Sequence, residues 1–144
     1  MNIGLIGCGR ISHVHMRAYK AMNNVEVIAV SDININKAKA FAYLYNINRT
    51  YSDYKELFEI KDLDFVDICT PTSTHESIVC DAAKAGINVL VEKPMGRNSK
   101  ECERMIFEAK KYETKICVSH NQLFYPFVRK LKSITESENF KMIC

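Results

Sequence analysis

Short apolar runs alternate with stretches of helical periodicity along most of the chain. Asn2–Ile6 is almost wholly apolar, which is typical of a strand buried on both faces of a sheet. Residues 25–31 form a second run of this kind. Between the two runs, apolar side chains recur at helical spacing, at Ile11, Val14, Ala18 and Met22. The chain is therefore predicted to begin with a strand, a helix and a second strand.

The same alternation continues toward the C-terminus. Asn34 can cap a helix whose predicted inner face carries Ala38, Phe41, Ala42 and Tyr45. Further strands are predicted near Thr50 and Tyr51 and over residues 65–70, 87–91 and 115–119. Further helices are predicted after Ser52 or Asp53, over residues 73–85 with Gly86 at the stop, after Asn98 or Ser99, and over residues 127–134. The predicted inner face of the helix after Asn98 or Ser99 carries Cys102, Met105, Ile106, Ala109 and Tyr112.

Strands that alternate with helices predict an α/β fold. Continuous apolar strands indicate a parallel sheet covered by helices on both faces. Right-handed crossovers then favour a doubly wound sheet with the strand order 3-2-1-4-5-6. We expect residues 1–137 to form one domain and residues 138–144 to begin a second domain that the chain lacks. The apolar residues there, Phe140, Met142 and Ile143, suggest an exposed strand through which copies could associate.

Composition and charge narrow the range of partners. The 144 residues are 47% hydrophobic and 26% charged, as in ordinary globular proteins, with a net charge of +3. The basic residues are spread along the chain, which argues against nucleic acid as the main partner. No apolar run approaches the roughly 18 residues of a membrane span. We therefore expect a cytoplasmic protein without a membrane partner.

The six cysteines and four histidines do not suggest a metal centre or a disulfide framework. No Cys-x-x-Cys pair occurs, and most cysteines fall in apolar strand or helix patterns. His13 and His15 would point to different faces of one helix. We interpret the cysteines as small buried side chains and predict no metal.

A glycine-rich loop follows the first predicted strand, with the order Gly7, Cys8, Gly9, Arg10, Ile11 and Ser12. This is the GxGxxG pattern with serine in the third glycine position. Gly7 permits a tight turn, and Gly9 lets the backbone approach a pyrophosphate. The amides at the start of the next helix would then face the anion. Ser12 is small enough for the helix to pack closely on the strand. The loop predicts a phosphate-binding site at the end of the first strand.

Asp32 ends the second predicted strand, 20 residues after Ser12. A carboxylate at that distance can accept hydrogen bonds from both hydroxyls of an adenosine ribose. It would also repel a 2′-phosphate, and no arginine follows closely to receive one. NAD is therefore favoured over NADP. The alternative is that Asp32 is a solvated carboxylate or a helix cap, although Asn34 can already serve as the cap.

Polar residues also stand at the ends of three later strands, where open α/β sheets bind ligands. The fourth strand ends in Thr70, Pro71 and Thr72, with His75 soon after, and the fifth in Glu92, Lys93 and Pro94. The sixth is followed by Ser119, His120, Asn121 and Gln122, before Phe124 and Pro126. With the Gly7-Cys8-Gly9 loop, these motifs cover nearly the whole chain in order. The chain resembles the Gfo/Idh/MocA family of oxidoreductases.

The resemblance implies the NAD(P)-binding Rossmann domain of a dehydrogenase that moves hydride between nicotinamide and a secondary alcohol of a sugar, an inositol or a sugar nucleotide. Thr70, Pro71 and His75 would line the path of the nicotinamide half. Glu92 and Lys93 would lie beside the nicotinamide ribose. Lys93 would be the catalytic group that polarises the substrate oxygen or moves its proton. Pro94 would fix the turn, and Asn121 or Gln122 would complete the wall of the site.

Simpler explanations exist for each motif. His75 could make only a local hydrogen bond, and Glu92 and Lys93 could form an exposed ion pair of little energetic value.

Family members also have a second domain, which supplies most substrate contacts and a histidine acting as acid or base. We therefore expect this chain to bind cofactor but to be catalytically incomplete. The alternatives are a stand-alone NAD-binding sensor or partner subunit, and an inactive remnant.

Overall fold

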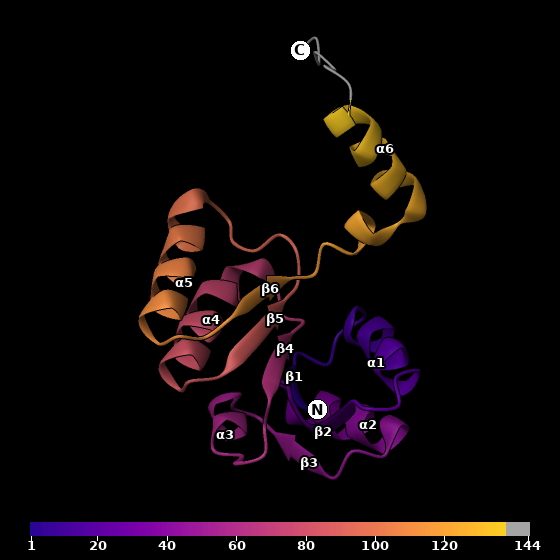
Figure 1. Ribbon diagram of the computed structural model, residues 1–144. Helices are drawn as coiled ribbons and strands as arrows, with labels where there is room; N and C mark the ends of the chain where they lie inside the picture. The colour runs from indigo at the N-terminus through magenta and orange to yellow at the C-terminus, as the bar shows by residue number, and fades with distance from the viewer. Residues whose placement is uncertain (138–144) are drawn as a thin grey trace.

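The computed structural model describes residues 1–137, and residues 138–144, where a second domain was expected to begin, lie outside the described part. The described chain forms a six-stranded parallel sheet in the order β3-β2-β1-β4-β5-β6 (Figure 1). Its strands are β1 (Asn2–Ile6), β2 (Glu26–Ser31), β3 (Arg49–Tyr51), β4 (Phe65–Ile68), β5 (Asn88–Val91) and β6 (Ile116–Val118). The predicted doubly wound sheet is confirmed.

The helices cover both faces of the sheet, and each side has its own apolar core. The helices that do so are α1 (Ser12–Lys20), α2 (Ile35–Tyr45), α3 (Lys55–Phe58), α4 (His75–Lys84) and α5 (Ser99–Lys111). The other helical elements of the described residues are α6 (Pro126–Ser137) and the 3-10 turns η1 (Thr72–Thr74) and η2 (Asn121–Phe124). Helices α1 and α2 pack Met16 and Phe41 on one face, and α4 and α5 pack Val79 and Met105 on the other (Figure 1). The sheet is therefore buried on both sides, as its apolar strands predicted.

Local capping fixes the helix ends where the sequence predicted them. Asn34 accepts a hydrogen bond from the Asn36 amide at 3.1 Å, and Asn98 accepts one from the Glu101 amide at 3.1 Å. These side chains satisfy amides that the first helical turn leaves unpaired. After α4, Gly86 has a φ of +74°, the left-handed conformation in which a helix commonly stops.

The buried face of α1 differs from the one its apolar pattern predicted. The helix buries Ser12, Met16 and Tyr19, whereas Val14 and Met22 are 46% and 49% exposed. The physical reason is a polar contact, because the Tyr19 hydroxyl donates to the buried Asp67 carboxylate of β4 at 2.8 Å. A smaller difference occurs in α5 and at its C-cap, where Ile106 and Tyr112 remain exposed although Met105 and Ala109 are buried.

Helix α6 lies apart from the sheet, beyond the end of β6 (Figure 1). Of its predicted apolar side chains, Phe127 and Leu131 are 69% and 58% exposed, Ile134 is 39% exposed, and Val128 is half-buried. No helix within residues 1–137 is long and apolar enough to cross a membrane.

Candidate functional site

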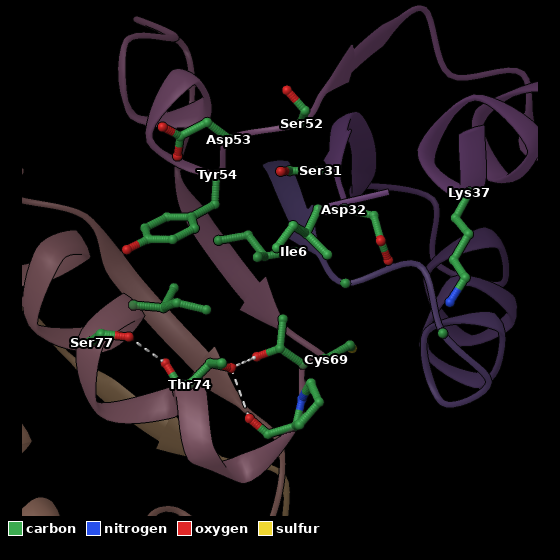
Figure 2. A pocket seen from close by; sticks show the side chains of 16 residues that line it. Ile6, Ser31, Asp32, Lys37, Ser52, Asp53, Tyr54, Cys69, Thr74 and Ser77 are labelled. Atoms are coloured by element: carbon green, nitrogen blue, oxygen red, sulfur yellow. Dashed lines mark hydrogen bonds between the residues drawn. The ribbon is translucent and has the colours of Figure 1, made fainter. Parts of the chain in front are cut away.

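A cavity of about 770 Å³ opens at the carboxyl edge of the sheet (Figure 2). Its wall comes from the segments that follow β1, β2, β3 and β4, and from the first turns of α4. Among the residues predicted from the sequence, it brings together Gly7, Gly9, Asp32, Thr70 and Pro71. Parallel strands end at one edge, so four separate loops can meet there, and the volume suits a small organic ligand.

The two glycines of the loop after β1 have different roles. Gly7 has a φ of +94°, and a Cβ on it would lie 2.9 Å from the carbonyl carbon of Cys69, so only glycine fits. Gly9 is exposed, and a Cβ there would meet no protein atom within 4 Å. The space above Gly9 is therefore free for a group that approaches the backbone. The buried Ser12 hydroxyl donates to the Gly9 carbonyl and fixes the loop against α1.

Asp32 is held in place by backbone amides at the end of β2. One carboxylate oxygen accepts the Cys8 amide at 2.9 Å, and the other accepts the Asn34 amide at 2.9 Å. Each oxygen keeps a further lone pair for a ligand hydroxyl. Burial, together with the charge of Asp32, raises the pKa of the Cys8 thiol to about 12. Cys8 is thus a packing residue rather than a nucleophile at neutral pH.

Several cavity residues were not predicted from the sequence. Lys37 reaches from α2 so that its amino group points toward the glycine loop (Figure 2). Ser52, Asp53 and Tyr54 close the far wall after β3. Burial and a 3.0 Å hydrogen bond to Asp81 raise the pKa of Tyr54 to about 12, so its hydroxyl remains a donor. The rule that ligands bind at strand ends would have indicated Ser52 and Asp53, which follow the third strand.

The segment after β4 presents hydroxyls to the cavity and holds His75 outside it. The Thr74 hydroxyl donates to the Pro71 carbonyl at 2.8 Å, and its oxygen lies 2.8 Å from the Thr70 hydroxyl, with which it shares a second hydrogen bond. His75 is 1% exposed, with Nε2 2.9 Å from the Thr70 carbonyl and Nδ1 3.1 Å from the Pro94 carbonyl. This side chain ties the end of β4 to the loop after β5, and it does not line the cavity.

Glu92 and Lys93 directly follow β5 and lie in different environments. Glu92 is 8% exposed, whereas Lys93 lies on the surface. Glu92 Oε2 accepts the Lys93 amide at 3.1 Å, and the Lys93–Pro94 peptide is cis. The alternative of an exposed Glu92–Lys93 ion pair does not fit a buried Glu92. Neither residue lines the cavity around Asp32, so they mark a separate part of the same sheet edge.

Four other predicted site residues lie at the surface or rim. Arg10 and Ile11 are exposed in the turn that leads into α1, and Thr72 is half-buried at the start of η1. Asn121 is exposed where η2 begins, after β6. None of them lines the cavity that Gly9 and Asp32 form.

A buried polar cluster links α1, β4 and the end of β5. His15 Nδ1 lies 2.8 Å from Asp67 Oδ2, and His15 Nε2 lies 3.0 Å from Glu92 Oε1. The Tyr19 hydroxyl and the Cys69 thiol donate to Asp67 at 2.8 and 3.6 Å. Burial, with the charge of Asp67, raises the pKa values of Tyr19 and Cys69, so both remain protonated donors. The sequence patterns did not indicate this cluster.

The cluster has metal-ligating atom types, since ligand atoms of His15, Asp67 and Cys69 lie within 4.8 Å of one another. Two nitrogen or oxygen ligands of tetrahedral zinc stand about 3.3 Å apart, given metal–ligand bonds of about 2.0–2.1 Å. The 2.8 Å between His15 and Asp67 is instead a hydrogen-bond distance. The geometry is that of a hydrogen-bonded group, and the absence of a metal stays a prediction.

Comparison with known proteins agrees with the fold. Residues 1–120 match the family model GFO_IDH_MocA, described as an oxidoreductase family with an NAD-binding Rossmann fold. Myo-inositol 2-dehydrogenase from Thermotoga maritima is 33% identical over 137 residues, which cover 95% of this chain and 41% of that protein.

Solved structures are similar over the same length. An oxidoreductase from Agrobacterium radiobacter in complex with NAD+, L-tartaric acid and magnesium is 26% identical, with a TM-score of 0.88 over 95% of this chain and 40% of that one. A 3-ketoreductase mutant from Actinomadura kijaniata in complex with TDP-benzene and NADP is 25% identical, with a TM-score of 0.86 over 95% of this chain and 44% of that one. The chain spans about two fifths of the length of these proteins.

Proposed function

The chain belongs to the Gfo/Idh/MocA family of oxidoreductases, and on that premise we propose that its cavity binds NAD as the cofactor of a dehydrogenase. The observation that carries this proposal is the free space above Gly9 beside the fixed Asp32 carboxylate. The open backbone suits a pyrophosphate, and the carboxylate suits ribose hydroxyls. Both groups line one cavity.

The nicotinamide half would extend past Thr70 and Pro71 toward Glu92 and Lys93. Nicotinamide supplies the hydride acceptor when the cofactor is bound. Lys93 would hold the substrate oxygen and take up or deliver its proton, because its side chain lies on the surface at the end of β5. The similarity to myo-inositol 2-dehydrogenase supports a secondary alcohol of an inositol or sugar as the substrate class.

The choice between NAD and NADP depends on two charges in the cavity. Asp32 favours an adenosine ribose with a free 2′-hydroxyl, because a 2′-phosphate beside the carboxylate would meet a like charge. Lys37 supplies a positive charge in the same cavity and would partly offset that repulsion. We propose that the chain binds NAD more tightly than NADP. Lys37 makes this preference smaller than it would be with Asp32 alone.

Thermal unfolding of this chain with NAD, NADH or NADP tests the proposal directly. A ligand at about 100 times its Kd stabilises a protein by about 2.7 kcal/mol, which raises Tm here by roughly 5–10 °C. We expect such a shift with NAD and NADH and a smaller one with NADP. No shift with any of them at millimolar concentration would contradict cofactor binding by this chain.

The proposed role of Lys93 needs a turnover assay. We suggest a chimera in which this chain replaces the matching 41% of the Thermotoga maritima relative. In that protein, Lys93→Ala should lower kcat by at least about a hundredfold while NADH affinity changes little. Near-normal kcat in the variant would remove Lys93 from the reaction.

A further inference from the structure

His15 connects three elements that the proposed site depends on. It lies in the first turns of α1, directly after the glycine loop, and its side chain is only 11% exposed. Its ring reaches Asp67 in the middle of β4 and Glu92 at the end of β5. Glu92 in turn accepts the amide of Lys93. One imidazole thus joins the phosphate-binding end of the site to the segment that carries Lys93.

With both carboxylates ionised, the two contacts of the ring call for a proton on each nitrogen. Carboxylate oxygens accept hydrogen bonds, so the nitrogen that faces each of them must donate. A neutral imidazole has one N–H and would turn a lone pair toward the second carboxylate. With distances of 2.8 and 3.0 Å, the cluster fits an imidazolium between two carboxylates, in which both hydrogen bonds are charge-assisted.

The surroundings of His15 favour that charged form. The described titratable groups that face the ring are Asp67 and Cys69 from β4, Glu92 from the end of β5, and Tyr19 from α1. The hydrogen bond to Asp67 raises the pKa of His15 above its ordinary value, Glu92 adds to the rise, and burial opposes it. The ring therefore loses its proton only above the pH range in which a free histidine does.

We propose that His15 is a positioning residue of the nicotinamide half, which holds Glu92, and through it the Lys93 segment, only while its ring bridges Asp67 and Glu92. This inference rests on the proposed function. Loss of one proton would break the bridge, because a ring nitrogen without hydrogen would face a carboxylate at about 3 Å. Glu92 would then be free to turn, and the Lys93 amide would lose its acceptor.

Binding of NADH to this chain, measured by nicotinamide fluorescence between about pH 6 and 9, tests the inference. For the wild-type chain, we expect Kd to rise with pH as His15 loses its proton. His15→Gln should bind NADH about tenfold more weakly at pH 6, because Glu92 then occupies its binding-competent position in only a fraction of the molecules, and its Kd should not vary with pH. If His15→Gln folds poorly, Glu92→Gln takes its place as the test. This variant keeps the His15–Asp67 pair, and its Kd for NADH should not vary with pH.

His13→Gln is the matched control, two residues earlier on the same helix. The His13 ring contacts the Tyr45 hydroxyl at 2.8 Å and the Phe41 ring, on the side of α1 that faces α2. This variant should bind NADH with the wild-type Kd and pH profile. A role of His15 in folding alone would lower Tm in His15→Gln without changing the pH dependence of Kd, and that result would overturn the inference.

Failure of the proposed function gives a different result. If the wild-type chain binds no NADH at any pH, both the cofactor site and the positioning role are overturned. If NADH binds equally well to the wild-type chain and His15→Gln across the pH range, the cofactor site stands and only the positioning role is wrong.

Discussion

Around β1 to β3, the polar groups of the proposed site are held by backbone, whereas at β4 and β5 they are held by buried side chains. Asp32 is fixed by the amides of Cys8 and Asn34, which neighbour it in adjoining loops. Glu92 is fixed by His15, which is itself fixed by Asp67, 52 residues away from it in the chain. The amides that hold Asp32 do not depend on the side chains of Cys8 and Asn34, whereas the position of Glu92 depends on the side chains of His15 and Asp67.

The largest loss of stability should follow substitution at β4 and β5, where buried side chains hold the polar groups. Asp67 is fully buried, and Asp67→Ala would leave His15 without one partner and the Tyr19 hydroxyl without its acceptor. Breaking a buried charged pair in this way lowers the free energy of unfolding by roughly 3–5 kcal/mol. Urea unfolding measures the change. Asp64→Ala, which removes an exposed carboxylate bound to the Asn2 amide, is the control and should cost about 1 kcal/mol.

Of the two glycines in the loop after β1, Gly7 should affect stability strongly and Gly9 should not. Gly7→Ala forces a Cβ onto a residue with a φ of +94° and within 2.9 Å of the Cys69 carbonyl. We expect a loss of about 3 kcal/mol. Gly9→Ala should change stability by less than about 0.5 kcal/mol, because nothing lies within 4 Å, yet weaken NADH binding. Equal stability of the two variants would contradict these assigned roles.

A smaller effect is expected on cofactor preference. Asp32→Asn keeps the shape and one acceptor but removes the charge, so the ratio of NADP Kd to NAD Kd should fall about tenfold. Lys37→Ala should change the same ratio in the opposite direction, because it removes the positive charge. Titration of each variant with both cofactors gives the ratios. An unchanged ratio in Asp32→Asn would show that Asp32 does not contact the ribose.

The smallest expected effect is the change of the free energy of unfolding with pH. The pKa of His15 in the folded chain is raised above the ordinary histidine value of about 6.5, chiefly by the hydrogen bond to Asp67. Its contribution to stability is therefore complete below about pH 6.5 and is lost as pH rises through the folded pKa, by at most about 1.4 kcal/mol per unit. Urea unfolding from pH 6 to 9 should show this decline in the wild-type chain but not in His15→Gln. Parallel curves would mean that the bridge does not form.

The two regions also differed in how far the sequence alone could predict them. Gly7, Gly9 and Asp32 follow a spacing that directly reflects backbone geometry, so the sequence indicated their place in the cavity. The prediction of which face of α1 is buried was wrong, because it rested on apolar periodicity alone. Val14 fits that pattern and is exposed, whereas Tyr19 is buried against Asp67. Hydropathy does not report a helix face that is buried by hydrogen bonds.

By itself, the sequence determined the alternation of strands and helices, the caps at Asn34 and Asn98, and the sheet order, because these depend on local periodicity and on the handedness of crossovers. Only the tertiary structure decided that His75 lies behind the cavity and that Lys37 faces it. It also decided that His15 meets Asp67 and Glu92. These contacts join residues far apart in the chain, and they exist only because parallel strands end at one edge and bring their side chains within hydrogen-bond distance.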